Sequence, residues 1–321
     1  MTAPNRGATS RPGIASATSA VPAGNIYDLG YRHYDGRRYG RLYAMWSLFV
    51  ESLRSVWGLG RPMQSKAVPF VLAGFYALPA FIQLAFSSVF AQRIAAGDQL
   101  TLFNYHNYFA GLYILVFFFC VAQAPELVCR DQRYQVLPLY FTRAMGRIEY
   151  ALARCASLAA ALFLLLAVPA VALFIGDILM QPDAFKAVGD ELPKALPAIP
   201  ANALIAAGLA SLSLAVSSFS PRRAYSAIGV VAYFLLMEAI PASLYAIGTS
   251  GQTAASTLLD KVFVVSPITS LIGASYWFFG QPTNAPDFQG TLTSDGYLLA
   301  AVASILVMTA VLIYRYRRIP A

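Results

Sequence analysis

The chain has 321 residues, of which 58% are hydrophobic and 12% are charged, and its mean hydropathy is +0.58. This composition excludes an ordinary soluble domain and predicts a membrane protein with several spans. The net charge of +8 requires no nucleic-acid partner, because basic residues also collect in the cytoplasmic loops of membrane proteins.

The N-terminal part of the chain precedes any apolar run long enough to cross a membrane. Residues 1–24 are rich in Ala, Ser, Thr, Pro and Gly, which predicts a disordered tail and not a signal peptide. Residues 25–66 begin as a basic arm, which suits contact with anionic headgroups as well as a docking role. Apolar side chains, including Trp46 and Trp57, then recur at helical spacing. We therefore expect an amphipathic helix in the inner membrane interface.

Six apolar runs reach roughly the 20 residues that a bilayer requires. These runs are apolar on every side, whereas a helix of a soluble protein would show a polar face. We therefore predict an all-α polytopic membrane protein with six transmembrane helices, in which residues 67–318 form the transmembrane domain. The runs cover residues 68–91, 107–128, 151–176, 200–219, 225–247 and 297–314.

The distribution of charge predicts the orientation of these spans. If the N-terminus and the C-terminus are both cytoplasmic, the inner segments hold nearly all of the basic residues, as membrane topology requires. The outer segments keep only Arg93, Lys186, Lys194 and Lys261. The sequence therefore predicts a multi-pass protein of the plasma membrane.

The segment 261–279, KVFVVSPITSLIGASYWFF, is apolar enough to form a seventh span. A full crossing would leave the basic C-terminal residues 315–318 outside the cell, against the charge rule. A serine, a proline and a glycine interrupt the segment, and such breaks must be sheltered by neighbouring helices at membrane depth. We therefore predict a re-entrant helical hairpin before the last span.

The segment 125–154, PELVCRDQRYQVLPLYFTRAMGRIEYALAR, separates the second and third apolar runs and is called the coupling loop below. It carries five arginines and three acidic residues around a compact apolar group at 137–141. The charged side chains suit charge-assisted bonds across an interface, and the apolar ones suit burial in the cleft of a partner. The alternative is a solvated loop that merely follows the charge rule.

No enzymatic motif is found in the sequence. It lacks the GxxxxGK phosphate loop, HExxH and CxxC. His33 and His106 lie on opposite sides of the predicted membrane and cannot share a metal ion. We therefore expect a chain that is not an enzyme and that holds no metal or cofactor of its own.

Glu238, in YFLLMEAIP, is the only carboxylate well inside a predicted span. Acids in a membrane are costly and face a partner or a cavity, so a role in substrate, proton or gate movement is one interpretation. The other is a structural acid that bonds to a neighbouring helix or to the re-entrant hairpin.

Together these features resemble the permease subunits of type-two ABC exporters (ABC-2 type). The resemblance rests first on the coupling loop, with its acidic residue, its basic patch and the Tyr-Phe-x-Arg turn before the third span. It also rests on residues 26–41, IYDLGYRHYDGRRYGR, which are similar to the N-terminal arm of such permeases from high-GC Gram-positive bacteria.

The resemblance implies a half-transporter that forms a homodimer, or a heterodimer with a similar permease. It also implies two copies of a separate ABC ATPase subunit, which would bind ATP and Mg²⁺ and dock on the coupling loop. Spans with few polar groups favour a lipophilic or amphipathic substrate. The implied docking residues are Glu126, Arg130, Asp131, Arg133, Tyr134, Leu137, Pro138, Leu139, Tyr140 and Arg143.

A second class of function is an ion-coupled carrier or channel that works without ATP. Such carriers usually show inverted repeats and several polar residues at the middle of the membrane. Apart from Glu238, the sequence shows neither feature.

Overall fold

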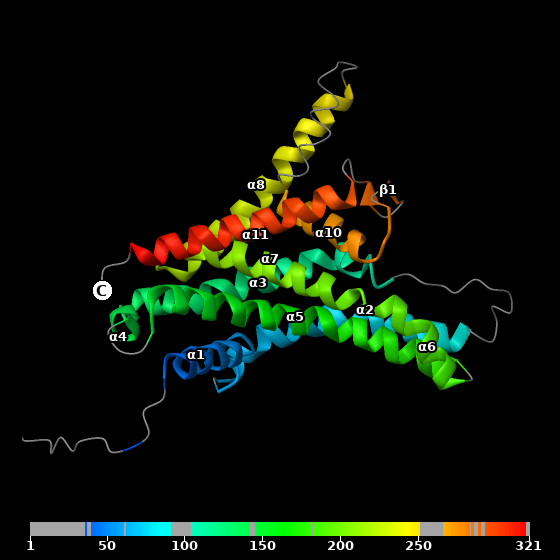
Figure 1. Cartoon of the computed structure of the whole chain (residues 1–321), viewed down its shortest axis with the longest axis horizontal. Helices are drawn as coiled ribbons and strands as arrows, with labels where there is room; N and C mark the ends of the chain where they lie inside the picture. The colour runs from blue at the N-terminus through cyan, green and yellow to red at the C-terminus, as the bar shows by residue number, and fades with distance from the viewer. Residues whose placement is uncertain are drawn as a thin grey trace, which may run out of the picture. The chain divides into compact units, whose positions relative to one another are not determined.

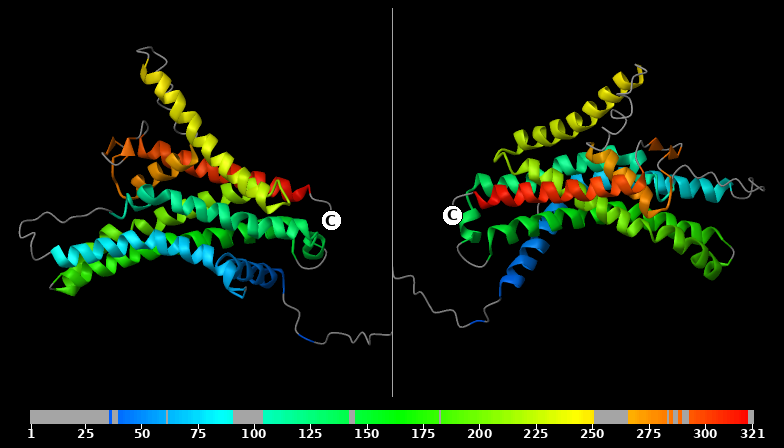
Figure 2. Two further views of the ribbon diagram at one scale, coloured as in Figure 1. Left: turned by 180° about the vertical axis from the view of Figure 1, so that it is seen from behind. Right: turned by 45° about the horizontal axis from the view of Figure 1, so that its top comes forward.

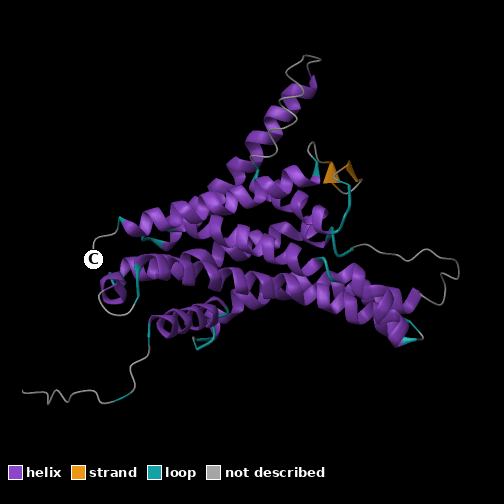
Figure 3. Ribbon diagram, viewed as in Figure 1, coloured by secondary structure: helices purple, strands orange, loops and turns teal. Residues whose placement is uncertain are grey.

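In a computed structural model, the described residues of the chain are almost wholly helical (Figure 3), which confirms the predicted all-α class. The predicted tail 1–24, most of the basic arm, Arg143 and residues 261–265 lie outside the described residues. The structure describes residues 36, 40–60, 62–90, 104–141, 145–181, 183–250, 266–282, 284–285, 288–289 and 293–318.

The helices and strands are labelled in Figure 1. The two strands form a short antiparallel pair. The elements are α1 (Arg41–Val56), α2 (Met63–Phe90), α3 (Tyr108–Arg133), α4 (Leu137–Phe141), α5 (Arg147–Met180), α6 (Ala184–Ala195), α7 (Ala198–Ser217), α8 (Arg223–Ser250), α10 (Pro267–Phe278), β1 (Asn284–Ala285), β2 (Phe288–Gln289) and α11 (Ser294–Arg317).

Six helical segments among the described residues are long and apolar enough to cross a membrane. They follow the six predicted runs in order, so the prediction of a multi-pass membrane protein is confirmed. The segments are Ser65–Ser87, Tyr108–Arg133, Arg147–Met180, Phe185–Ser217, Arg223–Leu244 and Ser294–Arg317.

The coupling loop is mostly helical, which corrects the prediction of one continuous loop at 125–154. Residues 125–133 complete α3, residues 137–141 form α4, and residues 147–154 begin α5. The 34 residues of α5 extend for roughly 51 Å at 1.5 Å per residue, which exceeds the hydrocarbon core of about 30 Å. The helices therefore continue beyond the apolar runs, and polarity alone misplaces their ends.

The C-terminus of α3 is a closed helix cap. Gln135 adopts a left-handed backbone with φ of 52°, and the Val136 N–H donates to the Asp131 carbonyl at 3.2 Å. This bond is typical of a Schellman motif, which satisfies carbonyls at a helix end and turns the chain sharply. The turn leads directly into α4.

α7 lies at the centre of the bundle and packs against α3, α5, α8, α10 and α11. It runs beside α3, α5 and α11 in the views of Figures 1 and 2, whereas α8 diverges from the bundle toward its C-terminal end. Small residues of α7, including Ala206, Gly208, Ala210 and Ala215, are buried. Small side chains let membrane helices approach closely, which explains the central position of α7.

α10 is held between α7 and α11 by two glycines. A Cβ atom at Gly208 of α7 would collide with the Leu271 side chain of α10, and a Cβ atom at Gly273 of α10 would collide with the Tyr297 ring of α11. The 12 residues of α10 extend for roughly 18 Å, too short to cross a core of about 30 Å alone. The described part of the 261–279 segment thus holds one short helix, and the predicted hairpin stays a prediction.

α1 packs against α5. Leu48, Ser52 and Val56 are buried, whereas Trp46 is 62% exposed. A helix with Leu42, Tyr43 and Trp46 uncovered thus lies at residues 41–56, and the amphipathic helix in the membrane interface stays a prediction.

One end of the bundle is basic and is called the basic end. Here α3, α7 and α11 finish, α5 and α8 begin, and α1 lies alongside. The arginines at this end include Arg130, Arg133, Arg222, Arg223 and Arg317. The other end, which holds α6 and the strand pair, is called the far end (Figure 1).

The fold predicts the accessibility of two exposed sites that α7 separates. Gly189 lies in α6 at the far end, and Pro221 lies in the turn between α7 and α8 at the basic end. With cysteine introduced at one site at a time, a membrane-impermeant thiol reagent should label residue 189 on intact cells and residue 221 only after permeabilisation. The unsubstituted chain is the control for its native cysteines, and labelling of both sites from the same side would contradict the topology.

Candidate functional site

A buried charged pair joins α3 to α5 at the basic end. The Arg154 guanidinium donates to Oδ2 of Asp131, and the Tyr150 hydroxyl donates to the same oxygen at 2.6 Å. The side chains of Arg154 and Asp131 are only 8% and 11% exposed. Removing either partner would leave the other charge buried and unpaired, which typically costs several kcal/mol. The pair therefore fixes the end of α3 against the start of α5.

The same arginine also joins α1 to α5. A second nitrogen of Arg154 donates to the Ser52 hydroxyl at 2.8 Å, and that hydroxyl donates to the Leu48 carbonyl at 2.6 Å. Asp131, Tyr150, Arg154 and Ser52 are called the buried network below. Three helices that are distant in the sequence thus meet at one guanidinium group.

Aromatic rings enclose the buried network on the side of α4 and α11. The Tyr150 ring lies 5.6 Å from the Tyr140 ring, 6.0 Å from the Phe141 ring and 5.2 Å from the Tyr316 ring, centroid to centroid. Burial raises the pKa of the Tyr140 hydroxyl above its usual value, and the nearby Asp131 carboxylate raises it further. The rings of α4 therefore pack directly against Tyr150 of the buried network.

The opposite side of α3 is bonded to the turn between α7 and α8. Glu126 forms an ion pair with Arg223 at 2.8 Å. The Cys129 thiol donates to the Ser220 carbonyl at 3.1 Å, and the Gln132 amide donates to the Ser218 carbonyl at 3.0 Å. The last two turns of α3 are thus held on both sides.

The structure divides the predicted docking residues by exposure, and Arg143 lies outside the part described. Glu126, Pro138 and Tyr140 are half-buried. Asp131 and Leu137 are buried inside the chain in this structure, and their predicted docking role stays a prediction. The exposed residues, called the docking patch below, are Arg130, Arg133, Tyr134 and Leu139.

Helical phase accounts for the burial of Asp131. Ala124, Leu127 and Val128 are buried on one face of α3, and Asp131 follows at the same spacing. Helical numbering through residue 133 therefore places Asp131 on the core side, where it requires a basic partner.

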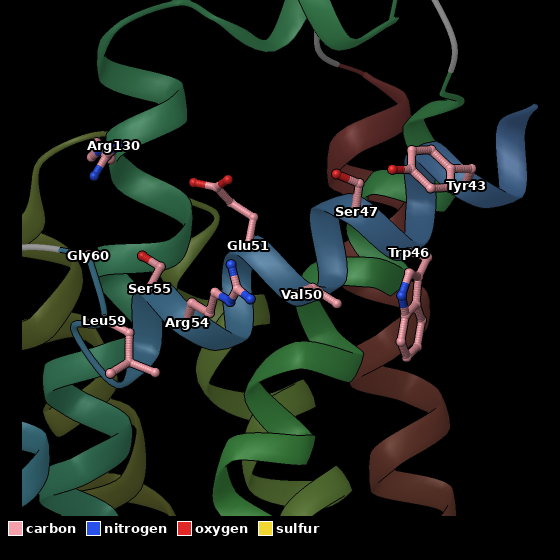
Figure 4. Close-up of a pocket in the computed structure, with 10 residues that line it drawn as sticks. All are labelled: Tyr43, Trp46, Ser47, Val50, Glu51, Arg54, Ser55, Leu59, Gly60 and Arg130. Carbon is pink, nitrogen blue, oxygen red and sulfur yellow. The ribbon is translucent and has the colours of Figure 1, made fainter. Parts of the chain in front are cut away.

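A groove of about 780 Å³ lies between α1 and α3 beside the docking patch. Figure 4 shows Arg130 of α3 across from Glu51 of α1, with Arg54 and Ser55 on the same helix. Tyr43 and Leu59 add apolar surface at the rim. The sequence predicts only an amphipathic helix at this point, and it gives no local sign that Glu51 and Arg54 lie opposite the coupling loop.

Glu238 of α8 bonds to the start of α10. Its carboxylate accepts a hydrogen bond from the Ser266 hydroxyl, and the Ser266 oxygen accepts one from the Thr269 N–H at 3.1 Å. Ser266 is fully buried, so α10 begins inside the bundle, where its first N–H groups need partners. A carboxylate is also favoured at a helix N-terminus by the helix dipole. The contact supports the structural interpretation of Glu238.

Comparison with known families gives one assignment. A family model described as "Protein of unknown function (DUF2705)" matches residues 70–319. The chain belongs to this family. The match starts within α2 and runs past the end of α11, so it takes in most of the first candidate span and all of the other five, and it leaves out α1. A search of curated proteins gives no match.

Among the residues that the structure describes, no three His, Cys, Asp or Glu side chains gather as potential metal ligands.

The buried network predicts a large loss of stability when its acid is removed. Asp131→Ala should lower the free energy of unfolding by about 3 to 5 kcal/mol, because the Arg154 charge would stay buried without its partner. The double variant Asp131→Leu/Arg154→Met should recover most of this loss. Denaturant unfolding in detergent micelles measures both values.

Arg41→Ala serves as the control for this measurement. Arg41 forms an ion pair with Glu149 at 3.1 Å and is 72% exposed, so its removal should cost less than about 1 kcal/mol. If Asp131→Ala also lowered the free energy of unfolding by less than about 1 kcal/mol, the buried network would not be important for stability.

The bond from Ser266 predicts different outcomes for two substitutions of Glu238. Glu238→Gln keeps a hydrogen-bond acceptor and should unfold within about 1 kcal/mol of the wild type, whereas Glu238→Leu should lose about 1 to 3 kcal/mol. Ser266→Ala should resemble the leucine variant, and the double variant should show less than the sum of both losses. Thermal unfolding checks this order. A stable Glu238→Gln protein without transport activity would instead favour a role in substrate or proton handling.

Proposed function

We propose that the chain is the permease subunit of an ABC-2 type exporter, driven by a separate ATPase subunit. The observation that carries this proposal is the construction of the basic end. An exposed patch and a groove lie directly over a rigid network that ties together α1, α3 and α5. The six candidate membrane spans supply the pathway that such a subunit requires.

The docking patch has the composition of a transient protein interface. Arg130 and Arg133 can donate charge-assisted hydrogen bonds to carboxylates of a partner. Tyr134 and Leu139 are 67% and 65% exposed, and such side chains are suited to burial in a cleft of the ATPase. The adjacent groove between α1 and α3 adds a concave surface that an element of the partner can enter.

The bonds behind this patch support transmission of movement. α4 packs by its rings on Tyr150, which belongs to the buried network. α3 is further bonded to the turn that starts α8 through Glu126 and Gln132. Displacement of α4 by an ATPase that closes on ATP and Mg²⁺ would therefore move several spans together, because packed helices do not deform independently.

In the proposed orientation, the basic end faces the cytoplasm at the plasma membrane, the N-terminus and the C-terminus are cytoplasmic, and α1 lies in the inner interface with Trp46 toward the headgroups. α10 forms one arm of a re-entrant hairpin. Its buried start and the bond between Trp277 and Asp295 of α11, 2.6 Å long, support a helix that rises from inside the bundle to the far end.

The transporter would contain two permease chains and two ATPase chains. The second permease is another copy of this chain or a similar one. Apolar spans with few polar side chains support a lipophilic or amphipathic substrate that leaves the cell.

A paired charge reversal tests the docking surface. Arg130→Glu/Arg133→Glu should abolish most copurification of the ATPase and most ATP-driven transport, while membrane insertion and thermal stability stay unchanged, because exposed interface charges guide docking more than folding. Arg222→Glu/Arg318→Glu is the matched control. It makes the same charge change at two exposed positions of the basic end that lie outside the patch, and it should retain the ATPase.

Full retention of ATPase binding and transport in the Arg130/Arg133 variant would refute the docking surface. If the wild-type chain copurifies with no ATP-hydrolysing subunit and transports solute along an ion gradient, the ATP-independent carrier is the better assignment.

A further inference from the structure

An apolar groove of about 560 Å³ opens on the membrane-facing side of the bundle between α2, α3 and α8. α2 and α8 both pack against α3, which forms the floor of the groove. Val71 and Phe118 are about half exposed and line it beside small residues of the three helices. The groove is separate from the docking patch and from the buried network.

Three alanines create the hollow. Ala67 of α2, Ala122 of α3 and Ala227 of α8 line it, one from each helix. Larger side chains at these three positions would fill the groove, because the helices lie close enough for such side chains to pack against one another. Since the surroundings are membrane spans, the hollow holds hydrocarbon rather than water.

At the basic end, the groove finishes at the positively charged side chain of Arg223. Arg223, the first residue of α8, is the only charged residue that lines it. Its guanidinium forms an ion pair with Glu126 at 2.8 Å and is still 66% exposed. Arginine presents several N–H donors in a planar fork, so the ion pair leaves donors that can reach a phosphate group.

The dimensions of the groove match one leaflet of a bilayer. Phe118 precedes Glu126 by eight residues on α3, which places the apolar part within roughly 12 Å of the charged end. The hydrocarbon depth of one leaflet is about 15 Å. An acyl chain can therefore lie along α3 while its headgroup stays at the level of Arg223.

We infer that this groove is a binding site for one anionic glycerophospholipid, with an acyl chain against the three alanines and the phosphate bonded to Arg223. Arginine binds phosphate through paired N–H donors, and basic pockets between spans commonly bind acidic headgroups. Lys66 stands next in sequence to the lining residue Ala67, and together with Arg223 it makes this end of the groove positive, which disfavours a cationic choline headgroup. This inference does not rest on the proposed function.

Lipid titration of the full-length chain tests the site. The chain, purified in detergent and delipidated, is titrated with dioleoyl phosphatidylglycerol, dioleoyl phosphatidylcholine or inorganic phosphate, and retained lipid is counted by native mass spectrometry. At the tightest binding site, the Kd for phosphatidylglycerol should be about tenfold lower than the Kd for phosphatidylcholine, as expected for one hydrogen-bonded charge. Inorganic phosphate should neither bind measurably nor compete at millimolar concentration, because it lacks the acyl chains.

Substitutions separate the phosphate contact from a structural role of the ion pair. Arg223→Gln should abolish the tenfold preference for phosphatidylglycerol. Glu126→Gln breaks the same ion pair but keeps the cation, so it should preserve or increase the preference. Arg222→Gln is the matched control; Arg222 stacks over Tyr225 at 5.7 Å and does not line the groove, so the preference should stay.

Filling the hollow tests the acyl contact without any change in charge. Ala122→Leu/Ala227→Leu should weaken the tightest binding of both lipids about tenfold or more, with unchanged thermal unfolding. Equal affinity for the two lipids in the wild type, or loss of the preference in Glu126→Gln as in Arg223→Gln, would overturn the proposal. It would also be overturned if the filled variant bound lipid like the wild type but no longer formed dimers, because the groove would then be a contact between two copies.

Discussion

Arg154 is the side chain on which the organisation of the basic end depends. A charged group withdrawn from water must be neutralised by a partner, or the fold loses several kcal/mol. Asp131 neutralises the guanidinium from α3, and Ser52 accepts a further hydrogen bond from α1, so three helices have one mutual arrangement. The rings of Tyr150 and Tyr316 then bring α11 against the same point. The need to neutralise Arg154 thus fixes the register of helices that apolar contacts alone would allow to slide along one another.

A second constraint acts inside the bundle, where α10 begins. A helix that starts away from water exposes N–H groups that only protein can satisfy. Ser266 and Glu238 supply oxygen atoms at that point, and the glycines at 208 and 273 allow neighbouring helices to close around it. The one carboxylate that the sequence places deep in a span therefore has a local structural task, which any role in transport would have to accommodate.

The sequence predicted the spans well because the demand of a bilayer for apolar length is strong and local. Six runs were expected, and six candidate helices follow in the same order. It did not predict where the helices end at the coupling loop, since the apolar runs stop near residues 128 and 151 although α3 and α5 continue through the charged residues between them. The contact between Arg154 and Ser52 could not be predicted from local sequence patterns, because the two residues are 102 positions apart and only tertiary packing brings them together. Asp131 was the exception, because its helical phase marked it as buried.

The location of the ionic pair also has a consequence for how the protein is made. Helices of a membrane protein are synthesised in order from the N-terminus, so Asp131 emerges before Arg154 exists. A carboxylate at the middle of the bilayer would then wait without a partner in hydrocarbon. At the end of α3 it can stay hydrated until α5 arrives, and water leaves only as the helices close. If the basic end faces the cytoplasm, as proposed, the fold thus acquires a buried ion pair without passing an ionised group through the lipid phase.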